Sequence, residues 1–449
     1  MRDPEGSLEF VGDHLIRSIA ANAESLPFLR LPIARQLVAD RRLVDFETLS
    51  DTRLQSPRLP FVSAPFEWCD SQLRAAARLT LDISIAIEPH GYELKDASAW
   101  NVIFQGCQPL FCDHLSFKPV TTSQWWAFGQ FLRHFVFPLQ VSRTTGLTGA
   151  RIFRLSRDGL QAAETLRLLG LRRVFTRIWP LMWMSGTRAA PARPPARARA
   201  QRSADGRVRG LHRNLYSFLS WALGGGEGRR RDSLWIDYTQ SRTHYEPVTQ
   251  DFKRDTVERW LDQSRPGRLI DVGANTGEFT KLAAARGISV VALEQDPECV
   301  TRIYEESRGD SRIHPVLSNL GDLCGGVGWL GTEHSSLFSR LRGHADMVLM
   351  LAVIHHLAIS ESIPLPMIAD FAAELTRDYA IIELIHDTDP MLGQLAAQRN
   401  RRAGEFSMSA QDAAFRRRFE FVAEQELPGT SRRLVLMRKL DRAEPDGRP

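Results

Sequence analysis

The chain has 449 residues, with 43% hydrophobic and 25% charged residues, which excludes a generally disordered or fibrous protein. This length allows two or three domains, each with its own core. The net charge is +5, but eleven arginines against three acidic residues lie between positions 186 and 232, so the rest of the chain is slightly acidic. The basic charge is therefore local, and it does not predict a basic groove on a folded domain.

The amino-terminal residues carry mixed charge without an apolar core segment, and the apolar run 169–184 is interrupted by three arginines. We therefore expect neither a secretory signal nor a membrane span, and we expect a cytoplasmic protein. The five cysteines are scattered and form no Cys-x-x-Cys pair, so neither a disulfide framework nor a metal site is indicated.

In the first half of the chain, one segment predicts a helix, a loop and a hairpin. Apolar residues recur on one helical face, and Gly91 predicts the end of that helix. The recurring residues are Leu73, Ala77, Leu81 and Ile85. Residues 94–101, Leu-Lys-Asp-Ala-Ser-Ala-Trp-Asn, then lead into an expected hairpin that ends at Asp113.

This order resembles the catalytic loop of protein kinase-like phosphotransferases. Asp96 is followed five positions later by Asn101, and Asp113 stands where a metal-binding acid would lie. Asp and Asn are also common turn residues, so chance is an alternative explanation of the spacing. An active kinase needs a lysine on an upstream strand beneath a glycine-rich lid, and the first lysine here is Lys95. We therefore expect residues 1–160 to form a degenerate α+β kinase-like domain that recognises a ligand without phosphorylating it.

The middle of the chain changes in composition. The aromatic residues between Trp125 and Phe131 have helical spacing, which is most simply explained by core packing. We expect a helical extension over 161–185, followed by an Arg/Pro/Gly-rich linker over 186–232. Within this linker, residues 186–210 are expected to be flexible and residues 215–223 to form a short helix.

From residue 233 to residue 440, strand and helix patterns alternate, which predicts an α/β domain with a mostly parallel sheet and right-handed crossovers. Strands are expected at 268–272, 288–293, 313–317, 347–352 and 379–385, and around 419–422 and 434–437. Helices are expected near 252–261, 276–285, 297–306 and 365–375. A short segment with Pro428 and Gly429 joins the last two strands, which predicts an antiparallel edge hairpin. Residues 441–449 are expected to be a disordered tail.

Residues 269–280, Leu-Ile-Asp-Val-Gly-Ala-Asn-Thr-Gly-Glu-Phe-Thr, read as a buried strand, a glycine turn and a helix start. Gly273 allows a sharp turn, Gly277 leaves space for a ligand, and the helix start presents free N–H groups. A dinucleotide-binding turn has Gly-x-Gly-x-x-Gly, but Asn275 replaces its second glycine and Asp271 precedes the turn. This spacing disfavours a nicotinamide coenzyme.

The pattern Asp-x-Gly-x-x-x-Gly resembles motif I of class I S-adenosylmethionine-dependent methyltransferases. Glu294 ends the next apolar run, where this family has an acid that accepts both ribose hydroxyls; a solvated strand-end acid is the alternative. The resemblance implies a seven-stranded, doubly wound Rossmann-like sheet with S-adenosyl-L-methionine as the cofactor. The cofactor-binding residues that it implies are Asp271, Gly273, Asn275, Gly277, Glu294, Asn319 and Asp322.

This resemblance also implies which residues lie at each end of the cofactor. Asp271 and Gly273 would border the methionine end, with Asn275 and Gly277 in the turn beneath it. Asn319 or Asp322, after the third strand, would lie near the adenine amino group, although turn chemistry explains both residues equally well. Asn319 departs from the acid expected there, which puts the adenine contact in doubt.

After the fourth strand, residues 349–357, Leu-Met-Leu-Ala-Val-Ile-His-His-Leu, resemble motif IV of small-molecule methyltransferases. They differ from the Asn-Pro-Pro-Tyr of enzymes that act on nucleobase amines. His355 or His356 could accept a proton from a hydroxyl, and a histidine satisfied by backbone groups is the alternative. Glu383, at the end of the fifth strand, could orient or deprotonate a substrate, or it could cap a helix or pair with Arg399.

The whole layout resembles a group of bacterial two-part proteins related to rhizobial host-specificity nodulation proteins. This resemblance lies in residues 61–68, 94–101, 327–329 and 352–357. It implies methyl transfer but not the acceptor, for which we favour a small or carbohydrate-like molecule, with oxygen slightly ahead of nitrogen. The alternatives are an RNA- or protein-directed methyltransferase that uses the basic linker to contact RNA or an acidic surface, and a non-catalytic kinase-like module fused to a cofactor-binding domain.

Overall fold

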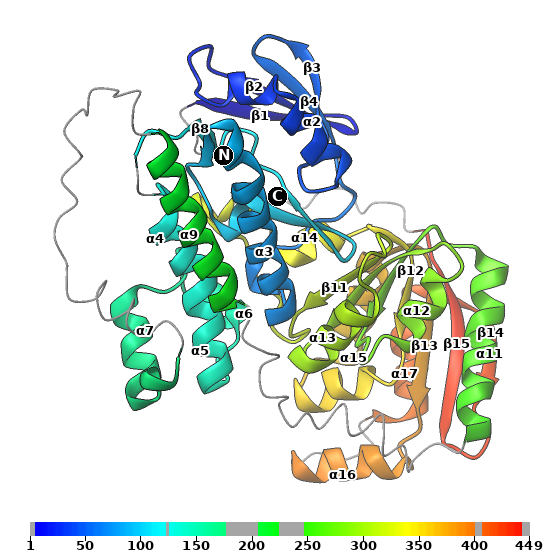
Figure 1. Ribbon diagram of the computed structural model, residues 1–449. Coiled ribbons are helices and arrows are strands. Elements are labelled where there is room, and N and C mark those ends of the chain that lie inside the picture. Colours follow the sequence, from blue (N-terminus) through cyan, green and yellow to red (C-terminus); the bar gives the residue numbers. More distant parts are fainter. Residues whose placement is uncertain (1–4, 123–124, 177–204, 224–246, 400–405, 442–449) are drawn as a thin grey trace. The chain divides into compact units, whose positions relative to one another are not determined.

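The computed structural model describes residues 5–122, 125–176, 205–223, 247–399 and 406–441 (Figure 1). The chain divides into two compact units, Met1–Arg231 and Asp232–Pro449, called here the N-terminal and C-terminal units. Residues 186–204 and 224–232 of the expected linker, and residues 442–449 of the expected tail, lie outside the described residues. Among the helices that are described, none is long and apolar enough to cross a membrane.

The N-terminal unit begins with a four-stranded antiparallel sheet in the order β1-β2-β4-β3. Its strands are β1 (Gly6–Val11), β2 (His14–Ile19), β3 (Glu47–Ser50) and β4 (Arg53–Pro57). The helices α1 (Leu26–Leu29) and α2 (Pro32–Ala39) connect β2 to β3. The sequence analysis predicted none of these short elements.

The long helix α3 (Asp70–Ile87) follows, and its first turn is capped by the Gln72 side chain, which accepts from the Cys69 N–H (3.0 Å). Leu73, Ala77 and Leu81 are buried as predicted, but Ile85 is 43% exposed, because the buried face of the helix has turned to Ile83 and Ile87 by that point. Gly91 ends the helical segment with a left-handed φ of 81°, as predicted.

The expected hairpin is present after this helix, as β6 (Val102–Gln105) paired with β7 (Gln108–Phe111). A second antiparallel pair joins β5 (Tyr92–Leu94) to β8 (Phe117–Pro119). Together the two pairs hold the loop 95–101 and the residues after Phe111 in one region. The loop that carries Asp96 therefore comes next to Asp113 through local pairing.

Helices form the rest of the N-terminal unit: α4 (Phe128–Phe131), a π-helical segment (Leu132–Val136), α5 (Phe137–Thr145), α6 (Gly149–Leu155), α7 (Ala162–Leu169), a 3₁₀ segment (Gly170–Phe175) and α9 (Asp205–Leu223). The helix α9 runs along α3 and begins at Asp205, so it extends into the segment expected to be flexible (Figure 1). The ring of Tyr216 on α9 meets Trp125 edge to face at 5.1 Å. Arg74 on α3 also donates to the Leu223 carbonyl (2.9 Å).

The C-terminal unit contains a seven-stranded sheet in the order β11-β10-β9-β12-β13-β15-β14. Its strands are β9 (Arg268–Val272), β10 (Ser289–Glu294), β11 (Ile313–Leu317), β12 (Ala345–Met350), β13 (Thr376–Ile385), β14 (Phe419–Glu426) and β15 (Arg432–Lys439). The first five are parallel, and β15 runs antiparallel between β13 and β14. This mixed sheet and its edge hairpin confirm the class I methyltransferase fold that the sequence predicted.

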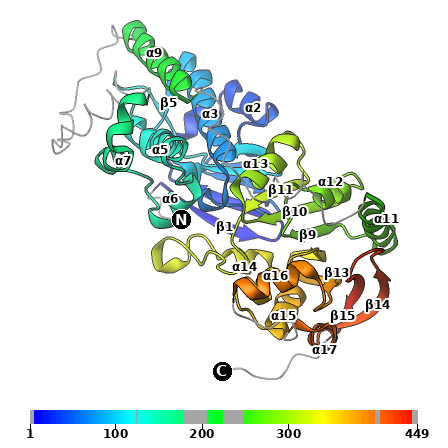
Figure 2. The ribbon, with the colours of Figure 1, turned by 90° about the horizontal axis from the view of Figure 1, so that it is seen from below.

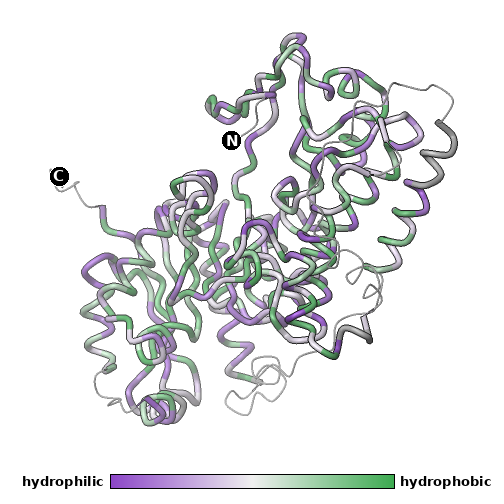
Figure 3. Tube along the Cα trace, turned by 90° about the vertical axis from the view of Figure 1, so that its left-hand side faces the viewer, coloured by the Kyte–Doolittle hydropathy of each residue, from purple (hydrophilic) through white to green (hydrophobic). Residues whose placement is uncertain are grey.

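Helices cover both faces of this sheet. They are α11 (Pro247–Ser264), α12 (Glu278–Ala284), α13 (Pro297–Glu306), α14 (Leu337–Leu341), α15 (Leu365–Leu375), α16 (Pro390–Gln398) and α17 (Met408–Arg416). Figure 2 shows α11 and α12 on one side of the strands and α15 and α17 on the other. One core joins Trp260 of α11 and Leu282 of α12 to strand residues such as Leu349. Along many helices in Figure 3 hydrophobic and hydrophilic stretches alternate, as expected of helices with one buried face.

Candidate functional site

The glycine turn after β9 has the backbone that its sequence predicted. Gly273 and Gly277 have φ values of 74° and 78°, and Asn275, between them, has a φ of 50°. A Cβ atom on Gly273 would lie 3.0 Å from the Val353 side chain, and one on Gly277 would lie 2.8 Å from Ile303. Because left-handed backbone and close packing coincide at both positions, only glycine fits them without strain.

Asp271 is the last but one residue of β9, and its side chain is buried. The Thr280 hydroxyl on α12 donates to its Oδ2 atom (2.6 Å). Burial raises the pKa of Asp271 to about 6, although the hydrogen bond from Thr280 and the charge of Lys253 act against this rise. The carboxyl group is thus fixed at the base of the turn by a neutral donor.

Glu294 ends β10 and lies directly against the glycine turn. Its Oε2 accepts from the Asn275 N–H (2.8 Å), and its Oε1 accepts from the N–H groups of Gln295 (2.7 Å) and Asp296 (2.8 Å). Burial raises the pKa of Glu294, and the three backbone bonds partly oppose this. A carboxylate has about four lone-pair sites, so Glu294 keeps some capacity to accept from a ligand.

Asn319 and Asp322 lie in the turn after β11, next to the same sheet edge. The Asn319 Oδ1 accepts from the Gly321 N–H (3.0 Å), which is the Asx-turn chemistry named as the alternative. Asp322 is exposed, and its N–H donates to the Asn319 carbonyl (3.1 Å). The Ser318 N–H donates to the Glu294 carbonyl (2.8 Å), so the turn is anchored close to Glu294. A role for either side chain in adenine binding stays a prediction.

His355 and His356 follow β12 in a constrained loop, where Ala352 has a φ of 53° and His356–Ser360 form a π-helical segment. The two imidazole rings are 4.1 Å apart. Burial and the neighbouring His356 hold the pKa of His355 well below its usual value, and burial lowers that of His356 to about 4. Both rings are therefore neutral near pH 7. The Nδ1 atom of His355 is buried and has no hydrogen-bond partner within the described part of the chain.

Glu383 lies on β13 in a buried charge network that the sequence analysis did not predict. Its oxygens accept from Lys253 Nζ on α11 (2.6 Å) and Arg432 Nη1 on β15 (3.0 Å). The Arg432 Nε also donates to Asp389 (2.8 Å). Burial opposes ionisation of Glu383, but the two cations outweigh it and lower its pKa to about 2. The arginine that pairs with Glu383 is thus Arg432 and not Arg399.

Asp96, Asn101 and Asp113, the residues of the expected kinase-like loop, also come together. The Asn101 Nδ2 donates to the Asp96 carbonyl (3.4 Å) and to Ser116 (3.2 Å). Asp113 forms a buried ion pair with Arg17 of β2 (3.3 Å) and accepts from the Ser116 hydroxyl (2.6 Å). Burial, followed by the negative charge of Asp113, raises the pKa of Asp96.

Comparisons with known proteins agree with the geometry of the C-terminal unit. Residues 244–423 match the family model described as "Methyltransferase domain". The C-terminal unit is a class I S-adenosylmethionine-dependent methyltransferase domain. This assignment rests on the family match and on the placement of Asp271, Gly273, Gly277 and Glu294, and it makes S-adenosylmethionine the cofactor.

One relative matches both units of the methyltransferase. Nodulation protein NoeA of Rhizobium meliloti (strain 1021) is 28% identical over 454 aligned residues, which cover 96% of this chain and 94% of that protein. The match extends the resemblance to nodulation proteins over nearly the whole chain. It includes the N-terminal unit, which the methyltransferase family model does not cover.

Two solved structures are also similar to part of the chain. The N-methyltransferase NodS of Bradyrhizobium japonicum WM9, with bound S-adenosyl-L-homocysteine, is 12% identical, with a TM-score of 0.34 over 47% of this chain and 94% of that one. Magnesium protoporphyrin IX methyltransferase of Synechocystis PCC 6803 is 17% identical, with a TM-score of 0.33 over 51% of this chain and 95% of that one. Neither likeness is strong enough to bear on the acceptor.

Proposed function

We propose that this methyltransferase transfers its methyl group to a small or carbohydrate-like acceptor, with a hydroxyl oxygen slightly favoured over a nitrogen. The observation that carries the proposal is the buried Nδ1 atom of His355 beyond the carboxyl end of β12, which has no hydrogen-bond partner among the described residues. In open α/β sheets, ligands bind at this end of the strands. A neutral imidazole there can accept a hydrogen bond from the acceptor hydroxyl, or donate one to it.

The residues of the cofactor corner fit S-adenosylmethionine. Gly273 and Gly277 leave no side chain on the turn, and the buried Glu294 presents a carboxylate beside it. We assign Glu294 to the ribose hydroxyls, Asp271 and Gly273 to the methionine end, and Asn275 and Gly277 to the turn beneath. The turn that holds Asn319 and Asp322 is assigned to the adenine amino group.

The chemistry of this site needs orientation more than acid-base catalysis. Bound S-adenosylmethionine supplies an electrophilic methyl group on a sulfonium centre, and its positive charge disappears as the methyl group is displaced in line. Positioning and removal of water can therefore supply most of the acceleration. The low pKa values of His355 and His356 favour hydrogen bonding to the acceptor over storage of its proton.

We assign Glu383 a positioning role because its two cations keep it ionised and occupied. Lys253 and Arg432 both bond to it, so it is poorly suited to remove a proton from a substrate. The network instead joins α11 to β13 and β15, close to the cofactor corner. The arrangement of Lys253 near Asp271 supports this role, since its charge also acts on the pKa of Asp271.

We propose that the N-terminal unit is a degenerate kinase-like domain that binds a ligand without transferring phosphate. The ion pair between Arg17 and Asp113 supports this, because a magnesium ion would have to displace an arginine that already neutralises the acid. The second candidate function, capture of RNA or an acidic surface by the arginine-rich linker, depends mostly on residues outside the described ranges. A cytoplasmic location stays a prediction.

The cofactor assignment is tested by calorimetric titration of the full chain with S-adenosylhomocysteine. Glu294→Gln should weaken binding about 10- to 100-fold, because a neutral amide replaces a carboxylate that accepts hydrogen bonds. Asp310→Asn is the matched control, since the Asp310 carboxylate is half-buried and pairs with Arg312, two residues along the chain. Equal affinity of Glu294→Gln and the unchanged protein would contradict the assignment.

The acceptor class is tested by single-turnover transfer from cofactor with a labelled methyl group. Bacterial extract is separated into small-molecule, glycan, RNA and protein fractions, and the labelled product is analysed by mass spectrometry. The proposal predicts label in a small-molecule or glycan product. Label in RNA or protein would instead support the second candidate, and the absence of label from every fraction would contradict both.

A further inference from the structure

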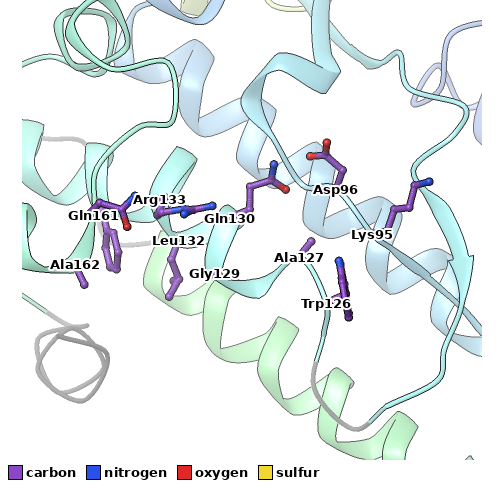
Figure 4. Close-up of a pocket in the computed structure, with 11 residues that line it drawn as sticks. Lys95, Asp96, Trp126, Ala127, Gly129, Gln130, Leu132, Arg133, Gln161 and Ala162 are labelled. Carbon is purple, nitrogen blue, oxygen red and sulfur yellow. The ribbon is translucent and has the colours of Figure 1, made fainter. Parts of the chain in front are cut away.

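The N-terminal unit contains a cavity of about 560 Å³ beside the loop that carries Asp96 (Figure 4). This volume lies within the range of small-molecule sites, roughly 300 to 1,000 Å³. The lining residues come from the loop after β5, from the turn before α4, from α4 and the π-helical segment up to the start of α5, and from the start of α7. The lining includes the polar or aromatic side chains of Asp96, Trp126, Gln130, Arg133 and Gln161.

The π-helical segment gives Arg133 its position in this cavity. The Phe137 N–H donates to the Leu132 carbonyl, five residues earlier, and Pro138 has no N–H to offer. The Arg133 carbonyl is therefore left over, and it accepts from the Leu160 N–H (3.1 Å) at the entry to α7. A Cβ atom on Gly159 would lie 2.2 Å from this carbonyl oxygen, so the close approach requires glycine. The regular helical hydrogen-bond pattern is therefore interrupted at Arg133.

The Arg133 side chain has no partner within the described residues. Its Nε atom is buried without a hydrogen bond, and no described acid lies within ion-pair distance of its guanidinium. A buried donor without a partner costs roughly 1 to 3 kcal/mol, and more when it is charged. A guanidinium that lines a cavity is suited to a carboxylate or phosphate, which it can bind with two parallel hydrogen bonds.

Gln130 and Asp96 also line the cavity and bring an amide and a carboxyl group to it. The Gln130 Oε1 accepts from the Ala97 N–H (2.8 Å), and its side chain also hydrogen-bonds to the Asp96 carboxyl. Lys95 is occupied by Glu5 (2.5 Å), and in Figure 4 its side chain points away from Asp96. A carboxyl and an amide held side by side can bond to hydroxyl groups as acceptor and donor.

Trp126 adds an aromatic surface to the lining of the cavity. The prediction of core packing was correct for Trp125 and Phe131, which are buried, but wrong for Trp126, which is 60% exposed. The Lys118 ammonium lies 4.6 Å from the centre of its ring. A large exposed indole that lines a cavity is unusual for packing alone and is typical of a ligand contact.

We propose that this cavity binds a sugar-like ligand that carries several hydroxyl groups and one anionic group, either a carboxylate or a phosphate. Arg133 pairs with the anionic group, Gln130 and Asp96 bond to hydroxyls, and Trp126 covers the apolar face of the ring. Gln161, at the start of α7, lies beside Arg133 and adds a further polar contact (Figure 4). Binding in this cavity is separate from the methyl transfer of the C-terminal unit.

Ligand-observed NMR and calorimetry on the full chain test this proposal with four kinds of probe: hexuronates, hexose 6-phosphates, neutral hexoses and inorganic phosphate. We expect the hexuronates or the hexose phosphates to saturate one site and to bind more tightly than either neutral hexoses or phosphate. Arg133→Gln should weaken the tighter class at least about tenfold and leave neutral hexoses unchanged. Arg133→Lys should restore part of the affinity, and Trp126→Ala should weaken all the sugars.

Arg53→Gln is the matched control, because Arg53 is exposed on β4 and does not line the cavity. Its affinities should equal those of the unchanged protein, and near-ultraviolet circular dichroism shows whether each variant keeps its packed aromatic core. The proposal is overturned if no anionic sugar gives saturable binding at millimolar concentration. It is also overturned if phosphate alone binds as tightly as the hexose phosphates, or if a folded Arg133→Gln binds anionic sugars like the unchanged protein.

Discussion

Buried carboxylates lie at or just beyond the ends of strands in both units, but they differ in the groups that bond to them. In the C-terminal unit, the described residues that bond to Asp271 and Glu294 are the Thr280 hydroxyl and backbone N–H groups. In the N-terminal unit, Asp113 accepts from the Ser116 hydroxyl and is in addition paired with the guanidinium of Arg17. The first two acids are fixed in place with their charge uncancelled, whereas the charge of Asp113 is cancelled by the protein itself.

We infer that this difference separates acids that are available to a ligand from acids that support the fold. A neutral donor orients a carboxylate and leaves its charge to interact with a ligand, while a buried cation must be displaced before another cation can bind. By this criterion Glu383, with its two cations, belongs with Asp113 although it lies in the methyltransferase domain. The location of an acid near a functional corner is thus a weaker guide than the identity of its partners.

The largest effect should come from breaking the network of Glu383. Glu383→Gln leaves Lys253 and Arg432 buried with reduced compensation, which should lower the free energy of unfolding of the C-terminal unit by about 3 to 5 kcal/mol. Thermal unfolding measures this, in the transition that moves to higher temperature when S-adenosylhomocysteine is added. Glu420→Gln, on the exposed side of β14, is the control and should change stability little.

Two results of this experiment would contradict the distinction between Glu383 and Asp271. If Glu383 were held like Asp271, without dependence on a cation, the variant would unfold at the same temperature as the control. If Glu383 acted as a base, the variant would keep its stability and lose only the rate of methyl transfer. Either result would move Glu383 into the group of ligand-binding acids.

A smaller loss of stability is expected from breaking the ion pair of Arg17 and Asp113. A double-mutant cycle measures how strongly the two charges stabilise each other. Arg17→Met or Asp113→Asn alone leaves one buried charge unpaired and should cost about 3 kcal/mol. The double variant should cost less than the sum of the two, because neither charge remains. Chemical unfolding of the N-terminal unit, followed by its tryptophan fluorescence, measures all three variants.

Methyl transfer by the C-terminal unit serves as the reference in the same cycle. It should be unchanged in all three variants, because these residues lie in the other unit. Additive costs would show that Arg17 does not neutralise Asp113. A stabilisation of the unchanged protein by magnesium that Asp113→Asn abolishes would likewise contradict the assignment of this acid to the fold.

Local patterns in the sequence predicted the strands of the sheet and the backbone of the glycine turn well. The strands 268–272 and 313–317 and the helices 297–306 and 365–375 have the predicted bounds. Apolar runs and end signals define them; for example, the Asp296 side chain accepts from the N–H groups of Glu298 (2.8 Å) and Cys299 (3.2 Å) and so starts its helix. These signals lie within a few residues of the feature that they predict.

The features that were not predicted depend on distant or unusual contacts. Lys253 and Glu383 are 130 positions apart, and no periodic pattern connects them. Trp126 lies in the turn before α4, so the helical spacing used for the prediction does not extend to it. The position of Arg133 depends on the π-helical segment, which a regular helical spacing does not predict. The assembly of Asp96, Asn101 and Asp113 was predicted from spacing, but the partner of Asp113, Arg17, comes from a strand that the sequence pattern did not show.

The smallest effect concerns the pH dependence of unfolding and compares Asp271 with Glu383 directly. Burial raises the pKa of Asp271 from 3.8 to about 6, so the folded state binds more protons than the unfolded state between these values. The free energy of unfolding should therefore fall as pH rises through this window and stay level above it. Glu383 has the opposite sign, since its pKa lies below its ordinary value of 4.5, and its contribution is lost only as pH falls from 4.5 towards 2.

Unfolding of the cofactor-free protein at several pH values separates the two acids. Asp271→Asn should remove a decline of about 2 kcal/mol between pH ~4.5 and ~6, because the amide does not titrate. Glu383→Gln should leave that decline in place and flatten the curve only below pH 4.5. An unchanged slope in Asp271→Asn would mean that Asp271 is neutralised in the folded protein as Asp113 is, so that its charge would not be available to the cofactor.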